Sequence, residues 1–341
     1  MRVIMIGGSG FIGQHTAKFI SNNDLCVYDM VPPSFEADYV QGDILDEKRL
    51  EKSVDGSDAV IFLASLISVP RSFDALADYM NVNACGAASL IEAIKNANKR
   101  PKKVVLSSSA AVYGEGAYAC DIHGKVYPLP RTQDQLDRGS WEPRCPYCGR
   151  EVKPLPQAEG DELRPLSPYA LTKQVQEWLI TAMAPRLGYK AIVLRYFNVY
   201  GPGQRPDSPY SGVITKFITQ ATRENRLQVF EDGLQTRDYI YVDDVGEINA
   251  RALELEESAT INVGTGIRTS VLQLARLIAD RHGVDVVVGG YRQGDIRHSA
   301  AKIDLMRTRL GWQPRTTIEE GIVATENWMR ESGQLKNESS P

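Results

Sequence analysis

The segment RVIMIGGSGFIGQHTAKFI, residues 2–20, joins a short apolar run to a cluster of glycines and then to a helical pattern of apolar residues. The run Arg2 to Ile6 is rich in β-branched side chains, which favours a strand. Apolar residues then recur at helical spacing between Phe11 and Ile20. The segment therefore predicts a strand, a glycine-rich turn and a helix.

Working outward, the same alternation of apolar runs and helix-length segments continues. Further runs lie at residues 25–29, 58–64, 102–109 and 191–197, and a long helix is expected over residues 168–186. Strands that are apolar throughout and are separated by helices indicate a parallel sheet covered on both faces. The prediction is an α/β fold, a Rossmann-type doubly wound parallel sheet.

Beyond Gly201 the pattern becomes shorter and richer in Pro and Gly, which indicates a smaller C-terminal α/β lobe interleaved with the first. We expect residues 1–180 to form the Rossmann domain, with an inserted segment at 115–160. Residues 181–341 are expected to form mainly the second lobe, with some strands and helices returning to the sheet.

Composition narrows the class of protein. The chain has 341 residues, 43% hydrophobic and 24% charged, with a net charge of -4. This balance excludes intrinsic disorder and gives no electrostatic reason to bind nucleic acid. It contains no run of about 18 apolar residues and no pattern of a signal peptide at its start. Five cysteines argue against a secreted disulfide framework. We expect a cytoplasmic protein with no membrane or nucleic-acid partner.

The glycines of the first turn predict a dinucleotide site. Without side chains, Gly7, Gly10 and Gly13 let the backbone approach a pyrophosphate, although a tight turn alone could also require them. Asp29 ends the second strand about twenty residues later. A carboxylate there can accept hydrogen bonds from both ribose hydroxyls and would repel a 2′-phosphate. This favours NAD over NADP. Asp43 could accept from the adenine amino group, although an isolated carboxylate is more often a solvated loop residue.

Two segments predict acid–base chemistry. Tyr169 and Lys173 lie four residues apart on the expected helix, so they share a face, and the ammonium group can lower the phenol pKa from about 10. As an isolated pair they could equally be surface residues. Ser109 ends the strand at 102–109, at the edge where parallel sheets bind ligands. It is then placed to hydrogen-bond the same substrate oxygen.

Nearly the whole chain resembles an extended short-chain dehydrogenase/reductase of the nucleotide-sugar epimerase and dehydratase group. The matching segments are GGSGFIG, the aspartate after the second strand, GDILD, LAS, the NxxG at Asn83 to Gly86, SSSAAVYG, SPYALTK, RYFNVYGPGQ, RDYIYVDDV and RQGDIRH. The resemblance implies that Ser109, Tyr169 and Lys173 are catalytic. It also implies that Lys173 holds the nicotinamide ribose.

The resemblance implies further contacts as well. Those to NAD involve Phe11, Ile12, Ile44, Leu63, Ala64, Asn83, Ser107 and Tyr196. Those to a small-molecule nucleotide-sugar substrate involve Asn198, with Arg237 and Arg292 on the diphosphate, a role that suits guanidinium groups. Val229 resembles a residue that packs the nucleobase, although it could be plain core. Ser299 stands where some relatives have a bulky tyrosine, so it could admit larger sugars.

The residues after Ser109 bear on the reaction. Dehydratases of this group have an Asp and Glu pair there. This chain has Ala110 and Ala111, whose side chains cannot act as acid or base. Hydride transfer to NAD needs neither, so epimerisation at C4 through a 4-keto sugar is the leading hypothesis. The alternatives are a 4-ketoreductase or dehydrogenase, a 4,6-dehydratase, and a catalytically silent sugar-nucleotide sensor.

The segment between Gly114 and Tyr169 has 54 residues, about twice the length usual in the group that it resembles. It contains CDIHG and CPYCG, so Cys120 and His123, and Cys145 and Cys148, form two pairs at metal-ligand spacing. Four protein ligands fill a tetrahedral shell, which predicts a structural zinc site. The other interpretation is three reduced cysteines and a surface histidine.

Two expectations concern the wider assembly and the substrate. The cysteine-bearing insertion resembles one found in a subgroup of dTDP-L-rhamnose 4-epimerases, which favours a substrate of that type. A UDP-glucose type of substrate is the alternative. The expected helices near 82–98 and 168–186 carry apolar positions on more than one face. Relatives pair such helices across a two-fold axis, so we expect a homodimer.

Overall fold

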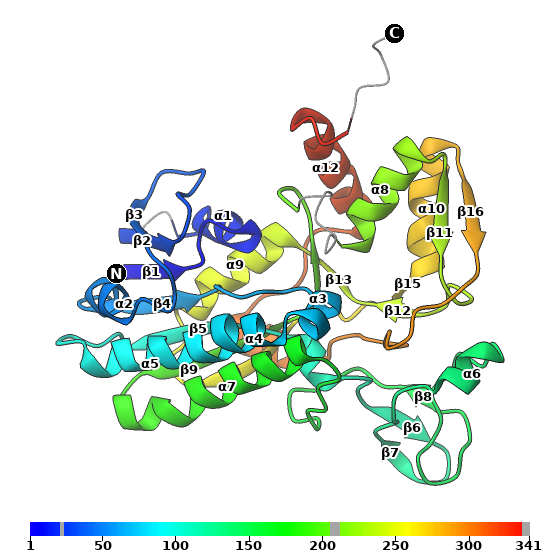
Figure 1. The fold of residues 1–341 in the computed structure, drawn as a ribbon, viewed down its shortest axis with the longest axis horizontal. Coiled ribbons are helices and arrows are strands. Elements are labelled where there is room, and N and C mark those ends of the chain that lie inside the picture. Colours follow the sequence, from blue (N-terminus) through cyan, green and yellow to red (C-terminus); the bar gives the residue numbers. More distant parts are fainter. Residues whose placement is uncertain (21–23, 205–211, 336–341) are drawn as a thin grey trace.

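A computed structural model describes residues 1–20, 24–204 and 212–335 (Figure 1). Its centre is a seven-stranded sheet in the order β14-β9-β5-β4-β1-β2-β3, in which every neighbouring pair is parallel. The strands are β1 (Arg2–Ile6), β2 (Asp24–Asp29), β3 (Asp38–Gln41), β4 (Ala59–Phe62), β5 (Lys103–Ser109), β9 (Lys190–Tyr196) and β14 (Ala259–Val263). The predicted Rossmann-type α/β fold is confirmed.

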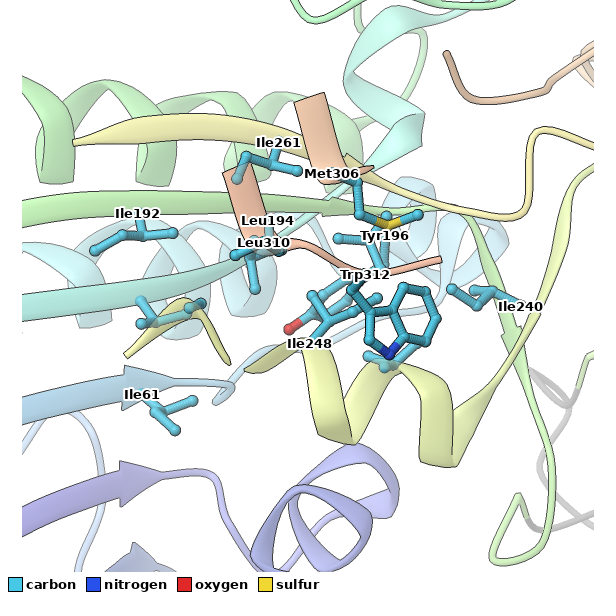
Figure 2. Close-up of a cluster of buried hydrophobic side chains, with 14 of the residues drawn as sticks. Ile61, Ile192, Leu194, Tyr196, Ile240, Ile248, Ile261, Met306, Leu310 and Trp312 are labelled. Carbon is cyan, nitrogen blue, oxygen red and sulfur yellow. The ribbon is translucent and has the colours of Figure 1, made fainter. Parts of the chain in front are cut away.

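Successive residues of each strand face opposite sides of the sheet, so each strand contributes to two cores. In β1, Val3 and Met5 belong to one buried cluster, and Ile4 and Ile6 belong to the other. The first cluster lies against α9 (Val242–Ala252) and α11 (Asp304–Leu310), where Trp312 packs close to Ile248 (Figure 2). Burial on both faces explains why these strands are almost continuously apolar.

Helices cover both faces. On the side of α9 lies α1 (Phe11–Ala17). On the other side lie α2 (Glu47–Val54), α5 (Gly86–Asn96) and α7 (Pro168–Leu187). The short helices α3 (Val69–Asp74) and α4 (Leu76–Tyr79) and the π-helical turn Met80–Cys85 lead into α5. Figure 1 shows α5, α4 and α7 alongside one another in front of the sheet. The predicted long helix is therefore α7.

The smaller lobe lies beyond the carboxyl ends of the strands. It is built from α8 (Val213–Arg223), β11 (Arg226–Val229), α10 (Val271–His282), β16 (Asp285–Val288) and α12 (Ile318–Glu331) around a separate apolar cluster. Short pairs connect the lobe to the sheet, β10 (Asn198–Tyr200) with β13 (Tyr239–Tyr241) and β12 (Thr236–Arg237) with β15 (Thr269–Ser270). The cleft between sheet and lobe contains the candidate site.

The inserted segment is a small unit of its own. It has the antiparallel strands β6 (Tyr118–Cys120), β7 (Gly124–Val126) and β8 (Lys153–Pro154) and the short helix α6 (Gln133–Asp137). Its few buried apolar residues include Cys120, Cys145 and Val152. In Figure 1 it lies below β12 and β15, at the lower right. Such a small core needs further stabilisation.

The strand β3 was not predicted, because it is short and contains Asp38 and Gln41, so it lacks an apolar run. β14 is a strand of residues 181–341 that returns to the central sheet, although its own position was not predicted. Within the described residues, no helix combines the length and the apolar character that crossing a membrane requires.

Candidate active site

A cavity of about 730 Å³ lies between the carboxyl ends of the strands and the smaller lobe. This is where open parallel sheets place their ligands. Most of the predicted site residues line it: Gly7, Gly10, Phe11, Ile12, Gly13, Asp29, Asp43, Ile44, Leu63, Ala64, Ser107, Ser109, Tyr169, Lys173, Tyr196, Asn198, Arg237 and Ser299. Residues far apart in the sequence thus meet in one cavity.

The glycine turn allows close packing at the floor of this cavity. Gly7 has φ +81°, and a Cβ atom there would lie 2.4 Å from the backbone nitrogen of Ala64. A Cβ atom at Gly13 would lie 2.2 Å from the carbonyl oxygen of Gly8. Both positions therefore require glycine, and the backbone between them is open to a ligand.

Asp29 ends β2 and is held by backbone amides. Its Oδ2 atom accepts a hydrogen bond from the Ser9 amide at 3.0 Å, and its Oδ1 atom accepts a longer one from Val31 at 3.3 Å. Asp43 follows β3, where its Oδ1 atom accepts from the Leu45 amide at 2.9 Å. Both carboxylates lie at the cavity in fixed orientations, as a site for ribose and adenine requires.

Local sequence places Tyr169 at the beginning of α7. Ser167 caps this helix by accepting from the Ala170 amide, and Pro168 occupies its first position. Tyr169 follows directly and is a largely buried part of the cavity wall. Burial raises the pKa of Tyr169 to about 12, although a hydrogen bond with the Ser109 side chain opposes part of the increase.

Lys173 lies one turn further along α7, 3% exposed. Its Nζ atom donates to the carbonyl oxygen of Ser107 at 2.9 Å. Burial lowers the pKa of Lys173 to about 7, and the negative charge of Glu177 opposes this effect. Burial is the largest influence on the pKa of both side chains. The expectation that Lys173 lowers the pKa of Tyr169 stays a prediction.

Sequence reasoning missed the polar layer beneath these residues. Glu177, a further turn along α7, forms a buried ion pair with Arg195 of β9 at 2.7 Å. The Ser108 hydroxyl donates to the same carboxylate at 2.5 Å. Because α7, β5 and β9 meet at this pair, it fixes the helix that carries Tyr169 and Lys173. The available sequence signal for Glu177 was its position four residues after Lys173, on the same face of the helix; nothing in the sequence indicated its pairing with Arg195.

The candidate substrate residues lie on the other side of the cavity. Arg237 of β12 donates from Nη2 to the carbonyl oxygen of Ile296 at 2.7 Å, and Ser299 is buried beside it. Asn198 begins β10 with its side chain exposed. Arg292 does not line the cavity but lies over the Phe230 ring, 4.3 Å from its centroid.

Two other predicted contacts do not line the cavity. Val229 is fully buried in the core of the smaller lobe. The amide group of Asn83 holds the segment after β4, since it accepts from the Leu66 amide at 2.8 Å and donates to the Leu66 carbonyl at 3.0 Å. It also donates to Thr172 of α7. Asn83 thus acts on the cavity wall through Leu66, which does line it.

Further lining residues were not predicted as contacts. They include Ala110 and Ala111 beside Ser109, and an apolar set made of Met30, Leu66, Ile67, Val69, Val82, Phe197, Val199 and Ile296. Apolar side chains at such positions carry no chemical signal in a sequence, because core packing would explain them equally well.

The four predicted metal ligands meet at the tip of the inserted segment. The ligand atoms of Cys120, His123, Cys145 and Cys148 all lie within 4.8 Å of one another. The Sγ atoms of Cys120 and Cys148 are 3.7 Å apart, and Nδ1 of His123 is 3.6 Å from Sγ of Cys120. Thiolates around tetrahedral zinc lie about 3.8 Å apart, from Zn–S bonds of about 2.3 Å. Backbone hydrogen bonds from His123 and Ile122 lower the pKa of Cys120 to about 6.

Comparisons with known proteins agree with this geometry. The sequence model of the NAD dependent epimerase/dehydratase family matches residues 3–264. The dTDP-L-rhamnose 4-epimerase of Burkholderia thailandensis is 31% identical, with 98% of this chain and 97% of that protein covered.

Solved structures give the same result. The UDP-N-acetylglucosamine 4-epimerase from Methanobrevibacter ruminantium, in complex with UDP-N-acetylmuramic acid, is 31% identical and superposes with a TM-score of 0.80, covering 97% of this chain and 98% of that one. MoeE5 in complex with UDP-glucose and NAD is 28% identical, with a TM-score of 0.79 and coverage of 97% and 99%.

Proposed function

The chain belongs to the NAD dependent epimerase/dehydratase family, and on that premise we propose that it is an isomerase that interconverts two nucleotide sugars of opposite configuration at C4. The observation that carries the proposal is the wall of the cavity around Ser109. Tyr169 and Lys173 lie there together with Ala110 and Ala111, so groups for moving one proton are present at this point and a second acid–base pair is not.

The cofactor of the proposed reaction is NAD, held by residues 1–180. The glycine cradle at Gly7 and Gly13, where a Cβ atom would collide with backbone, fits a pyrophosphate, and Asp29 fits an unphosphorylated ribose. Lys173 would hold the nicotinamide ribose, as in the family that the chain resembles. A bound NAD would supply a reversible acceptor for the C4 hydride.

The protein side chains move the proton. Tyr169 takes the proton of the C4 hydroxyl as the C4 hydrogen leaves as hydride, which makes a 4-keto sugar. The sugar then turns, receives the hydride on its opposite face and takes the proton back, so atoms and electrons balance without another reactant. Since burial raises the pKa of Tyr169 to about 12, its phenolate needs support, part of which the Ser109 hydrogen bond supplies. A protonated Lys173, one turn along α7, would add to that support in this proposal.

Residues 181–341 mainly hold the substrate in this proposal. Arg237 lies where it can reach a diphosphate, and Asn198 and Ser299 line the sugar side of the cavity. Arg292 and Val229 remain proposed contacts that would require the lobe to adjust on binding. The relatives act on dTDP-L-rhamnose and UDP-N-acetylglucosamine by name, so both nucleotides belong among the candidates.

The test is incubation of NAD-replete protein with a panel of UDP- and dTDP-sugars, including dTDP-L-rhamnose and UDP-glucose. Mass spectrometry and proton NMR should show an isobaric product inverted at C4. A product lighter by water would make the protein a dehydratase, and release of NADH with a product lighter by two hydrogens would make it a dehydrogenase. Either result, or no turnover of any sugar, would overturn the proposal.

The proposal includes a structural zinc ion in the inserted segment. Three thiols and one imidazole are a zinc donor set, and their spacing fits a closed tetrahedral shell. The small core of the segment gives the ion a role in stability. These ligands belong to no part of the cavity wall, so zinc takes no part in the proposed reaction.

A homodimer and a cytoplasmic location complete the proposal. The contacting helices α3, α4 and α7 carry four exposed apolar side chains, Phe73, Leu76, Leu171 and Trp178, which we group as one patch. A second copy of the chain would cover this patch by pairing α7 across a two-fold axis. None of the five cysteines, all of them within the described residues, forms a disulfide, which suits a reducing compartment.

A further inference from the structure

One stretch of backbone forms the outer wall of the sugar side of the cavity. Residues 295–302, which we call the strap, run between the inserted segment and β12. Ile296 and Ser299 of the strap line the cavity. On the inner side the strap is tied to β12, because the Ser299 amide donates to the Thr236 carbonyl at 3.1 Å and Arg237 donates to the Ile296 carbonyl.

The inserted segment ties the strap from its outer side. Gln157 exchanges two hydrogen bonds with Ala300, its amide donating to the Ala300 carbonyl and its side-chain oxygen accepting from the Ala300 amide, both at 2.8 Å. The Gln157 carbonyl also accepts from the Lys302 amide at 2.8 Å. Gln157 is 2% exposed, so these bonds are shielded from water.

Two charged residues of the insertion bind the other end of the strap. The carboxylate of Glu115 accepts from the Arg297 amide at 3.1 Å. Arg131 donates from Nη2 to the Asp295 carbonyl at 2.6 Å and from Nη1 to Glu231 of the smaller lobe at 2.8 Å. The side chains of Arg131 and Glu231 are 2% and 3% exposed.

The Arg297 side chain, 1% exposed, is the centre of this arrangement. It donates from Nε and Nη2 to Oε1 of Glu142, at 2.9 and 2.7 Å, and from Nη1 to Glu231 and Asp232, both at 2.8 Å. A guanidinium group buried in this way depends on its carboxylates, because removing one leaves charge without a partner in a region of low dielectric.

Glu142 joins two consecutive strap residues. While Oε1 accepts from Arg297, its Oε2 atom is 3.1 Å from Nε2 of His298, whose other ring nitrogen lies 2.9 Å from the Thr236 hydroxyl. Burial raises the pKa of Glu142, but the hydrogen bonds from His298 and Arg297 outweigh it and lower the pKa overall. Glu142 is therefore a carboxylate fixed between the insertion and the residues next to Ser299.

None of residues 115–160, all of which the structure describes, lines the cavity. The insertion can therefore affect the sugar only through residues that do. We propose that Glu142 is a positioning residue for the sugar pocket: through Arg297 and His298 it holds the strap so that Ile296 and Ser299 keep the place that sugar binding requires. The inserted segment thus acts as a brace on the substrate side of the cavity.

This inference rests on the proposed function, and Glu142→Gln tests it. The side-chain amide keeps the size of Glu142, but its nitrogen cannot accept from Arg297 or His298. With the sugar that the panel identifies, KM should rise about tenfold, the factor for one lost charge-assisted hydrogen bond, while kcat stays within about twofold. The Kd for NAD should not change. Glu142→Asp keeps the charge and should lie between the wild type and Glu142→Gln.

A second readout is independent of any activity. Hydrogen exchange of the strap amides, measured without substrate, should be faster in Glu142→Gln than in the wild type, while the amides of the glycine turn exchange alike. If no sugar is turned over, the proposed function fails, but hydrogen exchange still tests whether Glu142 holds the strap in place.

The matched control is Asp134→Asn, the same change of carboxylate to amide within the insertion. Asp134 pairs with Arg138 in an exposed ion pair on α6, away from the strap. This variant should match the wild type in KM and in hydrogen exchange. An unchanged KM and unchanged strap exchange in Glu142→Gln would overturn the proposal. So would a parallel loss of NAD affinity, which would indicate general loosening of the fold.

Discussion

The ammonium group of Lys173 is buried, and its pKa falls to about 7 from 10.5. Between these two values the unfolded chain binds more protons at this position than the folded protein does. The free energy of unfolding must therefore rise with pH across this window. Above about pH 10.5 both states are neutral and the effect ends.

Lys173→Met tests this linkage. Measured by denaturant titration from about pH 7 to pH 9 on protein freed of NAD, the free energy of unfolding should rise with pH more steeply in the wild type than in the variant. Comparing the two chains cancels the contributions of other groups. Parallel curves would mean that Lys173 keeps an ordinary pKa.

Tyr169→Phe removes only the hydroxyl that moves the proton. Turnover should fall by at least about 100-fold, because general acid–base catalysis contributes that much or more. Thermal unfolding and NAD affinity should be nearly unchanged. Tyr189→Phe is the control, since the Tyr189 hydroxyl donates to the Ile180 carbonyl near the far end of α7. Turnover of Tyr169→Phe close to that of the control would exclude Tyr169 as the base.

At the residue scale, the sequence predicted that Ser109, Tyr169 and Lys173 meet, because a strand end and helical spacing bring them to one edge of the sheet, and all three line the cavity. These residues could be found from local sequence patterns. Asp238 could not, although it is fully buried and accepts from the Thr265, Gly266 and Ala301 amides. Its partners are 27 to 63 residues away, and only the folded chain brings them together.

At the scale of elements, the apolar runs predicted β1, β2, β4, β5 and β9 well, because strands buried on both faces must be apolar throughout. β3 was missed since its residues are only partly buried, and its side chains therefore include charged and polar ones. The contacts of the insertion with the strap were also missed, because ion pairs between distant segments leave no periodic pattern.

The inserted segment gives a prediction at this scale. Purified protein should contain about one zinc ion per chain, measured by mass spectrometry of the metal, and Cys145→Ser should lose most of it. Without the ion, proteases should cut within residues 115–160 more quickly, because the segment has a small core. NAD affinity should persist. Cys85→Ser, at an exposed cysteine elsewhere, should retain wild-type zinc; equal metal content in both variants would refute the site.

At the scale of the whole molecule, the patch on α3, α4 and α7 predicts a dimer. Trp178 is 67% exposed and lies on α7 within the patch. Trp178→Glu would place a charge in the interface, so light scattering at micromolar concentration should show a monomer instead of a dimer. Ile267→Glu, at a position 64% exposed outside the patch, should stay dimeric. A monomeric wild type would remove the prediction.

The order of strands in the central sheet also determines when the sheet can form during synthesis of the chain. β5 is completed by residue 109, but its neighbour β9 begins at residue 190 and β14 at residue 259. A nascent chain leaving the ribosome therefore exposes the edge of β5 while the insertion and α7 are still being synthesised. The edge of β5 is covered once Tyr196 has emerged and β9 has paired with it, and the sheet is complete only after Val263. Chaperones therefore have a defined interval of synthesis in which to protect that edge.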